Sequence, residues 1–315
     1  MKEKKIAIIG TSPIMLIVAN HLSKSGHKIY VFSSKKKIGG AWSYHKYKNY
    51  YISTQTNVIV PDTKFEEKNI PLLNEYLKNE FKVTITKNHD KFMPLGYLAK
   101  KNYNYNLNPL YEKVSKNPKI KFFNKFIKKI NVKNKKVLID KMIFDEIFIT
   151  TFSGFEKIII DKSIIKVKPR VIISEHIMVI AKKINRRYLA YSENFNKNFD
   201  RAQIKKIGNY NSFTARVRKE KKGKDSFKLF LDSKLVKKKS DIIKIVKTKY
   251  KNYYRDYEQR DFLSRNLKGT PIKYILSTVF VESFFFANEK LKLLKKNIFR
   301  CYQNLVKNIS IYTIK

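Results

Sequence analysis

IAIIGTSPIMLIVANHLSKSGHKIYVF, the stretch from residue 6 to residue 32, holds the pattern that decides the fold. The apolar run at 6–9 is typical of a parallel strand buried on both faces. A turn at Gly10 leads into a helix expected over 14–24, which Gly26 ends, and a second apolar strand follows at 28–32. The order strand, helix, strand within about thirty residues predicts a βαβ unit.

The turn after the first strand has the features of a phosphate-binding site. Such a site needs glycine at a tight turn, small residues beside a pyrophosphate, and a helix N-terminus directed at the negative charge. Gly10 meets the first need and Ser12 takes the second glycine position, whereas Met15 stands where a third glycine is usual. Ser33 ends the second strand, where an acidic residue usually binds a ribose diol.

The glycine spacing extends beyond this unit. Gly10, Gly26 and the pair Gly39-Gly40, with apolar strands in register, resemble the FAD-dependent oxidoreductases, in particular the amine oxidase, protoporphyrinogen oxidase and UDP-galactopyranose mutase-like group. Residues 120–130 are similar to the strand of that family whose backbone, near Ile127, contacts the adenine. Residues 144–151 resemble the strand that returns to the cofactor domain.

The resemblance implies an α/β protein with a Rossmann-like FAD/NAD(P)-binding domain and a substrate-type domain built on a mixed or antiparallel sheet. We expect the first domain to comprise 1–45, 107–155 and 271–315, and the second 46–106 and 156–270. The cofactor-binding residues that we expect are Gly10, Thr11, Ser12, Pro13, Ser33, Ser34, Gly39, Gly40, Ala41, Trp42, Ile127 and Thr150.

The substrate and the catalytic residues are not readable from the sequence. Arg201 and Arg216 are candidates for contact with an anionic substrate in the second domain, or for ion pairs with residues such as Asp200 and Glu220. No side chain stands out as an acid, base or nucleophile. The resemblance implies an FAD-dependent oxidoreductase acting on a small molecule, with sugar or glycan metabolism as one family option.

Two other functions fit the same residues. Ser33 and Ser34, followed by Lys35, Lys36 and Lys37, replace the acidic ribose ligand with small and basic residues, which is how an NADP 2′-phosphate is accommodated. The departures at Ser12, Met15 and Ser33 also fit a catalytically inactive Rossmann scaffold with an interaction role. The absorbance spectrum of the pure protein separates these alternatives.

The basic charge favours coding bias over a nucleic-acid partner. The formal net charge is +44, but 59 of the 69 basic residues are Lys, and they are spread along the chain. Nucleic-acid sites favour Arg, whose planar group matches phosphate and guanine. Basic clusters at 186–188, 216–222 and 237–239 are interpreted as solvated edges or loops. Peripheral contact with a membrane stays open.

The remaining composition indicates a globular protein of the cytoplasm. Apolar residues make up 43% of the chain, and Cys301 is the single cysteine. No Cys/His cluster suggests a metal site. No signal peptide is visible, and the apolar run at 274–287 is too short to span a bilayer. This run is expected to be a buried helix or strand.

Further elements are expected from periodicity and turn residues. Helices are predicted over 71–81, 240–253 and 288–309. Strands are predicted at 83–86, 120–123, 127–130, 136–139, 144–150, 171–173, 177–180, 187–191, 212–218 and 227–231.

Overall fold

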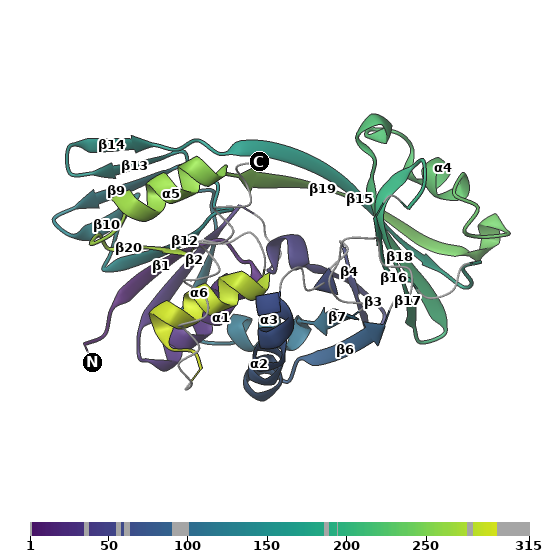
Figure 1. Cartoon of the computed structure of the whole chain (residues 1–315), viewed down its shortest axis with the longest axis horizontal. Helices are drawn as coiled ribbons and strands as arrows, with labels where there is room; N and C mark the ends of the chain where they lie inside the picture. Colours follow the sequence, from purple (N-terminus) through teal and green to yellow (C-terminus); the bar gives the residue numbers. More distant parts are fainter. Residues whose placement is uncertain are drawn as a thin grey trace.

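The computed structural model describes residues 2–34, 38–54, 58–59, 64–89, 101–185, 189–193, 195–275 and 280–294 (Figure 1). Five sheets and six α-helices make up this part of the chain. The helices are α1 (Pro13–Lys24), α2 (Lys64–Phe81), α3 (Asn108–Ser115), α4 (Ser226–Leu231), α5 (Tyr257–Asn266) and α6 (Phe280–Leu291).

A five-stranded parallel sheet forms the first half of the molecule. Its strand order is β20-β12-β1-β2-β8, and every neighbouring pair is parallel. The βαβ unit expected at 6–32 is present, and the Rossmann-like fold class is confirmed. The strands are β1 (Lys5–Ile9), β2 (Lys28–Ser33), β8 (Ile120–Asn124), β12 (Glu146–Thr150) and β20 (Ile272–Ile275).

Strand β1 lies between β2 and β12, so the strand order changes direction beside it. At such a point the connections leave toward opposite faces and open a crevice at the carboxyl ends of the strands. Helices α1, α2, α3 and α6 share one apolar core on one face of the sheet. The second core joins the sheet to α5 and a smaller sheet, which contains β9 (Lys129–Lys133), β10 (Lys136–Ile139), β11 (Met142–Phe144), β13 (Lys157–Ile160) and β14 (Ser163–Lys166).

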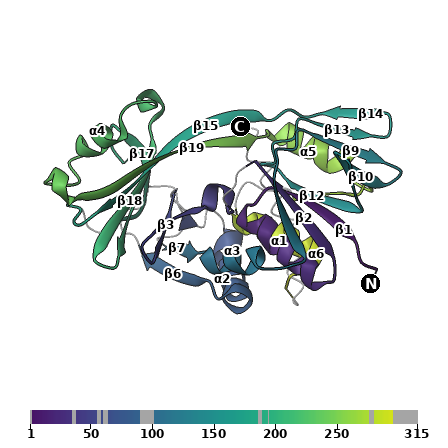
Figure 2. The ribbon, with the colours of Figure 1, turned by 180° about the vertical axis from the view of Figure 1, so that it is seen from behind.

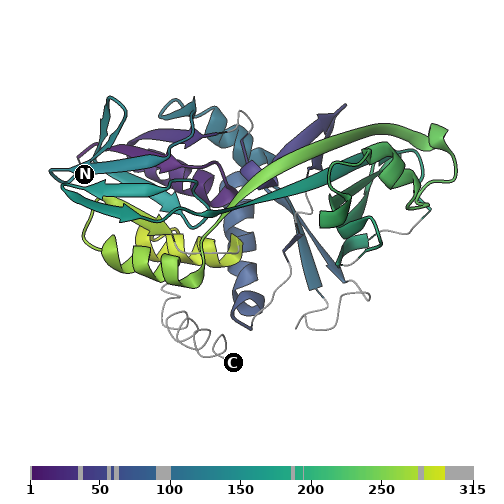
Figure 3. The ribbon, with the colours of Figure 1, turned by 90° about the horizontal axis from the view of Figure 1, so that it is seen from above.

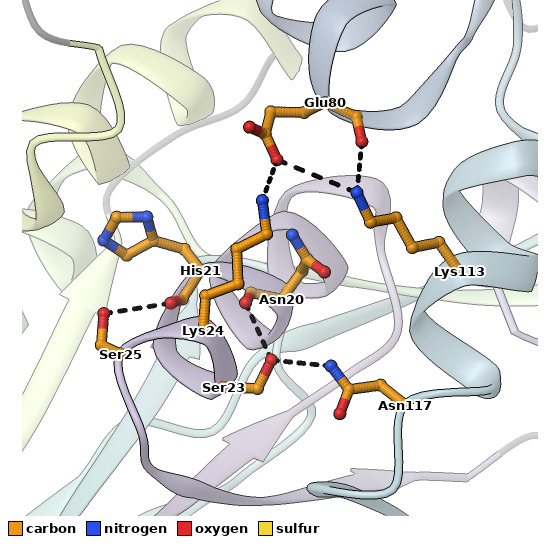
Figure 4. Close-up of polar contacts among 8 residues, drawn as sticks. All are labelled: Asn20, His21, Ser23, Lys24, Ser25, Glu80, Lys113 and Asn117. Atoms are coloured by element: carbon orange, nitrogen blue, oxygen red, sulfur yellow. Dashed lines mark hydrogen bonds and ion pairs between the residues drawn. The ribbon is translucent and has the colours of Figure 1, made fainter.

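The C-terminal end of α1 is fixed to α2 and α3 by the polar contacts in Figure 4. The Lys24 ammonium pairs with the Glu80 carboxylate of α2, and the Lys113 ammonium of α3 donates to the Glu80 carbonyl at 2.5 Å. The Asn117 amide donates to the Ser23 hydroxyl at 2.9 Å. These contacts hold the far end of the helix whose N-terminus faces the crevice.

An antiparallel sheet dominates the second half of the molecule. Its order is β16-β17-β18-β15-β19. The long pair β15 and β19 runs back toward the first half, where β19 ends shortly before α5 (Figures 2 and 3). These strands are β15 (Arg170–Ala181), β16 (Leu189–Glu193), β17 (Phe199–Ile207), β18 (Tyr210–Val217) and β19 (Ile242–Tyr254).

Two small sheets lie between these halves (Figure 1). One pairs β3 with β4, and the other has the order β5-β7-β6. Their strands are β3 (Tyr44–Tyr47), β4 (Tyr50–Ser53), β5 (Val58–Ile59), β6 (Thr84–His89) and β7 (Lys101–Asn106).

Two element predictions were wrong in type. The segment 240–253 is strand β19 and not a helix, because its β-branched and aromatic side chains pair with β15 along the whole strand. The segment 227–231 is helix α4 and not a strand. Asp225 caps this helix, because its carboxylate accepts a hydrogen bond from the Lys228 backbone N–H at 2.7 Å.

Two helices differ in their limits. Helix α2 begins at Lys64, so Pro71 lies inside it rather than at its start. Burial of Ile70, Leu73 and Leu77 offsets the hydrogen bond that Pro71 cannot donate. The C-terminal helix begins at Phe280 rather than 288, and the predicted part beyond residue 294 lies outside the described residues.

The packing of three segments differs from the expected domain division. Helix α2 falls in 46–106, but it packs in the core of the parallel sheet. Strands β13 and β14 and helix α5 fall in 156–270, yet β13 pairs with β9 and α5 packs beneath the same half. Sequence order does not show this packing for α2 and α5, because each returns to the first half after strands of the smaller sheets or of the antiparallel sheet.

A candidate cofactor cavity at the carboxyl edge of the parallel sheet

A cavity of about 400 Å³ opens at the crevice beside β1. The carboxyl ends of β1, β2 and β12, the N-terminus of α1, the start of α6 and the end of β19 all contribute to its wall. Its volume lies within the range of small-molecule and cofactor sites. Its position is the one where open α/β sheets bind their ligands.

The cavity collects the expected cofactor residues. All of those twelve residues except Gly39 line it, and they come from five separate stretches of the chain. Gly39 lies directly behind the wall, where its backbone N–H donates to the Thr11 carbonyl at 3.0 Å. The residues in the wall are Gly10, Thr11, Ser12, Pro13, Ser33, Ser34, Gly40, Ala41, Trp42, Ile127 and Thr150.

The Gly10 turn has the geometry that the motif requires. Gly10 has a φ of 104°, which favours glycine, and no heavy atom would lie within 4 Å of an added Cβ. Its backbone N–H donates to the Phe32 carbonyl at 2.8 Å, which ties the ends of β1 and β2 together. The Ser12 carbonyl accepts the first bond of α1, so the first-turn N–H groups beside the cavity have no acceptor within the helix.

Only glycine fits at position 39, because of its backbone conformation and the nearby ring of Tyr111. Its φ is 99°, and an added Cβ would lie 2.8 Å from the Tyr111 ring. The Tyr111 hydroxyl donates to the Trp42 carbonyl at 2.9 Å. The side chain of Tyr111 thus holds the loop that contains Gly39 and Gly40 against the N-terminal end of α1.

Thr11 provides a direct sign that the wall fits a polar ligand. Its side chain is only 4% exposed, and its Oγ1 finds no hydrogen-bond partner in the described part of the chain. A buried hydroxyl without a partner is unfavourable by roughly 1–3 kcal/mol. A ligand with a polar group at this wall would satisfy it.

Two departures from the glycine motif have different consequences. Met15, at the third glycine position, is buried in the helix-side core and does not line the cavity. Ser33 and Ser34 do line it, at the position of the usual acidic ribose ligand. The loss of the third glycine therefore leaves the cavity wall intact, whereas the loss of the acid changes what the wall offers to a ribose.

An aromatic pair that was not expected from the sequence also lines the cavity. The rings of Phe126 and Tyr253 stack with centroids 5.5 Å apart, and both line the cavity. Gly154 makes room for them, because an added Cβ would lie 2.3 Å from Phe126. Tyr253 was hidden by the wrong helix prediction, and no glycine motif marks Gly154.

Arg255, which was also not expected from the sequence, lies behind the turn that follows β12. Its side chain is 0% exposed and carries no carboxylate partner among the residues that the structure describes. The guanidinium donates to the carbonyls of Thr151 at 2.9 Å and Ser153 at 2.6 Å, and also to those of Phe155 and Val167. Burial lowers the pKa of Arg255 to about 10, so it is charged at neutral pH.

Arg201 and Arg216 lie on neighbouring strands, away from this cavity. The Arg216 guanidinium binds the Asp200 carboxylate at 2.7 Å, so it is an ion-pair partner, as the alternative reading of the sequence allowed. Neither arginine lines this cavity or the cavity between β3, β4, β6, β7, β17 and β18.

The described residues contain neither a metal-binding cluster nor a helix that could span a membrane. No cluster of three or more His, Cys, Asp or Glu side chains there is placed to hold a metal ion. Within the same ranges, every helix is too short or too polar to cross a membrane.

Solved structures of other proteins share this architecture. A double mutant of putrescine oxidase superimposes on 93% of this chain and 99% of its own, with a TM-score of 0.59 and 9% identity. A protein described as a protoporphyrinogen oxidase, from Exiguobacterium sp. 255-15, covers 94% of this chain and 100% of its own, with a TM-score of 0.57 and 8% identity. The chain has the fold of these two oxidases.

Sequence comparison reaches much less of the chain. No family model matches it. The flavin-containing monooxygenase FMO GS-OX-like 5 of Arabidopsis thaliana is 41% identical over 43 residues, which are 14% of this chain and 10% of that protein. The monooxygenase FMO GS-OX3 of the same plant is 40% identical over 42 residues. The chain thus spans about one tenth of the length of the curated relatives that it matches.

Proposed function

We propose that the cavity binds FAD and that the protein is an FAD-dependent oxidoreductase acting on a small molecule. The observation that carries this proposal is the convergence of residues 10–14, 33–34, 40–42, 125–127, 150 and 152–154 on one cavity beside β1. Bound FAD supplies the redox chemistry, and the protein supplies position and electrostatics.

The N-terminus of α1 would hold the pyrophosphate. The free N–H groups and the dipole of a helix N-terminus favour negative charge. Gly10 leaves space for the phosphates, and the Thr11 hydroxyl offers them a donor. No Asp or Glu lines the cavity in the described structure, so nothing there opposes two negative charges.

The other residues of the wall would hold the rest of the cofactor. Ser33 and Ser34 present hydroxyls to the ribose in place of a carboxylate, which makes this contact weaker than a charge-assisted bond. Phe126, Ile127 and Tyr253 offer an apolar surface for the adenine. Trp42 and Phe280 contribute apolar surface at the helix side of the cavity and keep water from it.

The test is a visible absorbance spectrum of the purified protein before and after incubation with FAD and removal of the excess. We expect a flavin spectrum, and FAD in the supernatant after denaturation. A colourless protein that takes up no FAD would overturn the proposal. The same titration with NADP⁺ tests the second candidate, which Ser33 and Ser34 favour because they leave room for a 2′-phosphate. Binding of neither nucleotide would leave a scaffold role.

A further inference from the structure

A second cavity, of about 350 Å³, lies among the strands of three sheets. Strands β3 and β4, β6 and β7, and β17 and β18 form its wall. Most residues of the wall carry a hydroxyl, an amide or an amine, among them Tyr44, Ser53, Asn104, Gln203, Lys205 and Thr214.

The polar groups of this wall are held in place by hydrogen bonds. The Gln203 amide donates to the Asn104 side-chain oxygen at 2.6 Å, and both residues are buried. The Thr214 hydroxyl donates to the Ser53 carbonyl at 3.1 Å, and the Tyr44 hydroxyl donates to the Tyr105 carbonyl at 2.8 Å. Groups fixed in this way lose little entropy when they bind a ligand.

Lys205 introduces an unbalanced positive charge into this wall. Its side chain is half-buried, and its ammonium has no ion pair with any carboxylate of the described residues. Burial lowers the pKa of Lys205 to about 8, so the group is still mostly charged at pH 7. A buried cation is unfavourable unless a counter-charge reaches it. Neither Asp nor Glu lines the cavity in the described structure.

We propose that the second cavity binds a small hydroxylated molecule that carries an oxyanion, with Lys205 as the counter-charge. The ammonium would pair with the oxyanion through charge-assisted hydrogen bonds, and the hydroxyls and amides of the wall would bind neutral hydroxyl groups. A cationic amine of the same size would be rejected, because it would meet a like charge in a partly dehydrated site.

The walls of the second cavity and of the cofactor cavity are connected by a hydrogen bond. Ser53 lines the second cavity, and the hydroxyl of the next residue, Thr54, is hydrogen-bonded to the hydroxyl of Tyr250, which lines the first. Thr54 is also bonded to the Ser43 carbonyl at 3.0 Å. If the proposed function is correct, the oxyanion-bearing molecule is its substrate, but binding at Lys205 does not depend on FAD.

The test compares three molecules of equal size, namely gluconate, glucose and glucosamine, by calorimetric titration of the full chain. We expect gluconate to bind at least about tenfold more tightly than glucose, and glucosamine more weakly than either. In Lys205→Met the preference for gluconate disappears. Lys244→Met removes the same charge from an exposed residue of β19 that lines neither cavity, and it keeps the preference.

Equal affinities for gluconate and glucose, or an equal loss of preference in the two lysine variants, would overturn the inference, as would the absence of gluconate binding. Lys205→Met should remain folded, because Met keeps the length of the side chain and removes a buried charge. Its urea midpoint at or above that of the wild type verifies this. Parallel FAD titrations separate the two proposals, since either ligand can fail to bind while the other binds.

Discussion

At the scale of single residues, Thr11 offers the most specific test of the cofactor cavity. Its hydroxyl is buried without a partner, so Thr11→Val removes an unsatisfied group and keeps the shape. We expect the urea midpoint of the ligand-free protein to stay equal or rise. The affinity for FAD should fall by roughly three- to tenfold, because one hydrogen bond to the ligand is lost. A lower midpoint, or an unchanged FAD affinity, would show that the hydroxyl has another role.

The sequence predicts some of the residues that line the two cavities, but not all of them. Gly10, Ser33 and Thr150 were predictable because the βαβ order and parallel pairing bring strand ends to one edge. Tyr253 and Lys205 were not predictable, because their positions depend on sheets formed between segments far apart in the chain. No local pattern marks a residue that becomes part of a cavity through such pairing.

At the scale of elements, Arg255 joins the end of β19 to the turn after β12. Its guanidinium donates to the backbone carbonyls of residues 151, 153, 155 and 167. Among the described residues, no other side chain donates a hydrogen bond to these carbonyls. We expect Arg255→Met to lower the free energy of unfolding by about 2–4 kcal/mol, because buried carbonyls lose their donor. Urea unfolding measures this loss.

Arg265→Met is the matched control for that variant. Arg265 is exposed, and its ion pair with Asp261 lies within α5 on the surface. The expected change is within about 0.5 kcal/mol, since exposed pairs contribute little. If the two variants lose the same stability, the carbonyl cluster does not stabilise the turn at the cavity.

Element types were predictable where periodicity and pairing agree. The strands of the parallel sheet are short apolar runs, as burial on both faces requires. Strand β19 was mistaken for a helix because its apolar residues do not alternate cleanly, since both faces of this long strand are partly exposed. Only its pairing with β15 decides the type, and pairing is not visible in a local window.

At the scale of the whole molecule, the fold brings the two cavities together. The first cavity collects the strand ends of the parallel sheet, and the second lies among strands of the smaller sheets and the antiparallel sheet. The chain reaches this arrangement by leaving the first core and returning to it, as α2 and α5 show. The central claim is that the cavity beside β1 binds FAD.

The affinity for FAD of Gly10→Ala and Gly26→Ala tests this claim most directly. Both glycines have positive φ, 104° and 89°, with nothing within 4 Å of an added Cβ, so similar backbone strain is expected in both variants. Only Gly10 lines the cavity. We predict that Gly10→Ala weakens FAD binding at least about tenfold while Gly26→Ala leaves it within about twofold of the wild type. Equal affinities in the two variants, or a wild type that binds no FAD, would contradict the account.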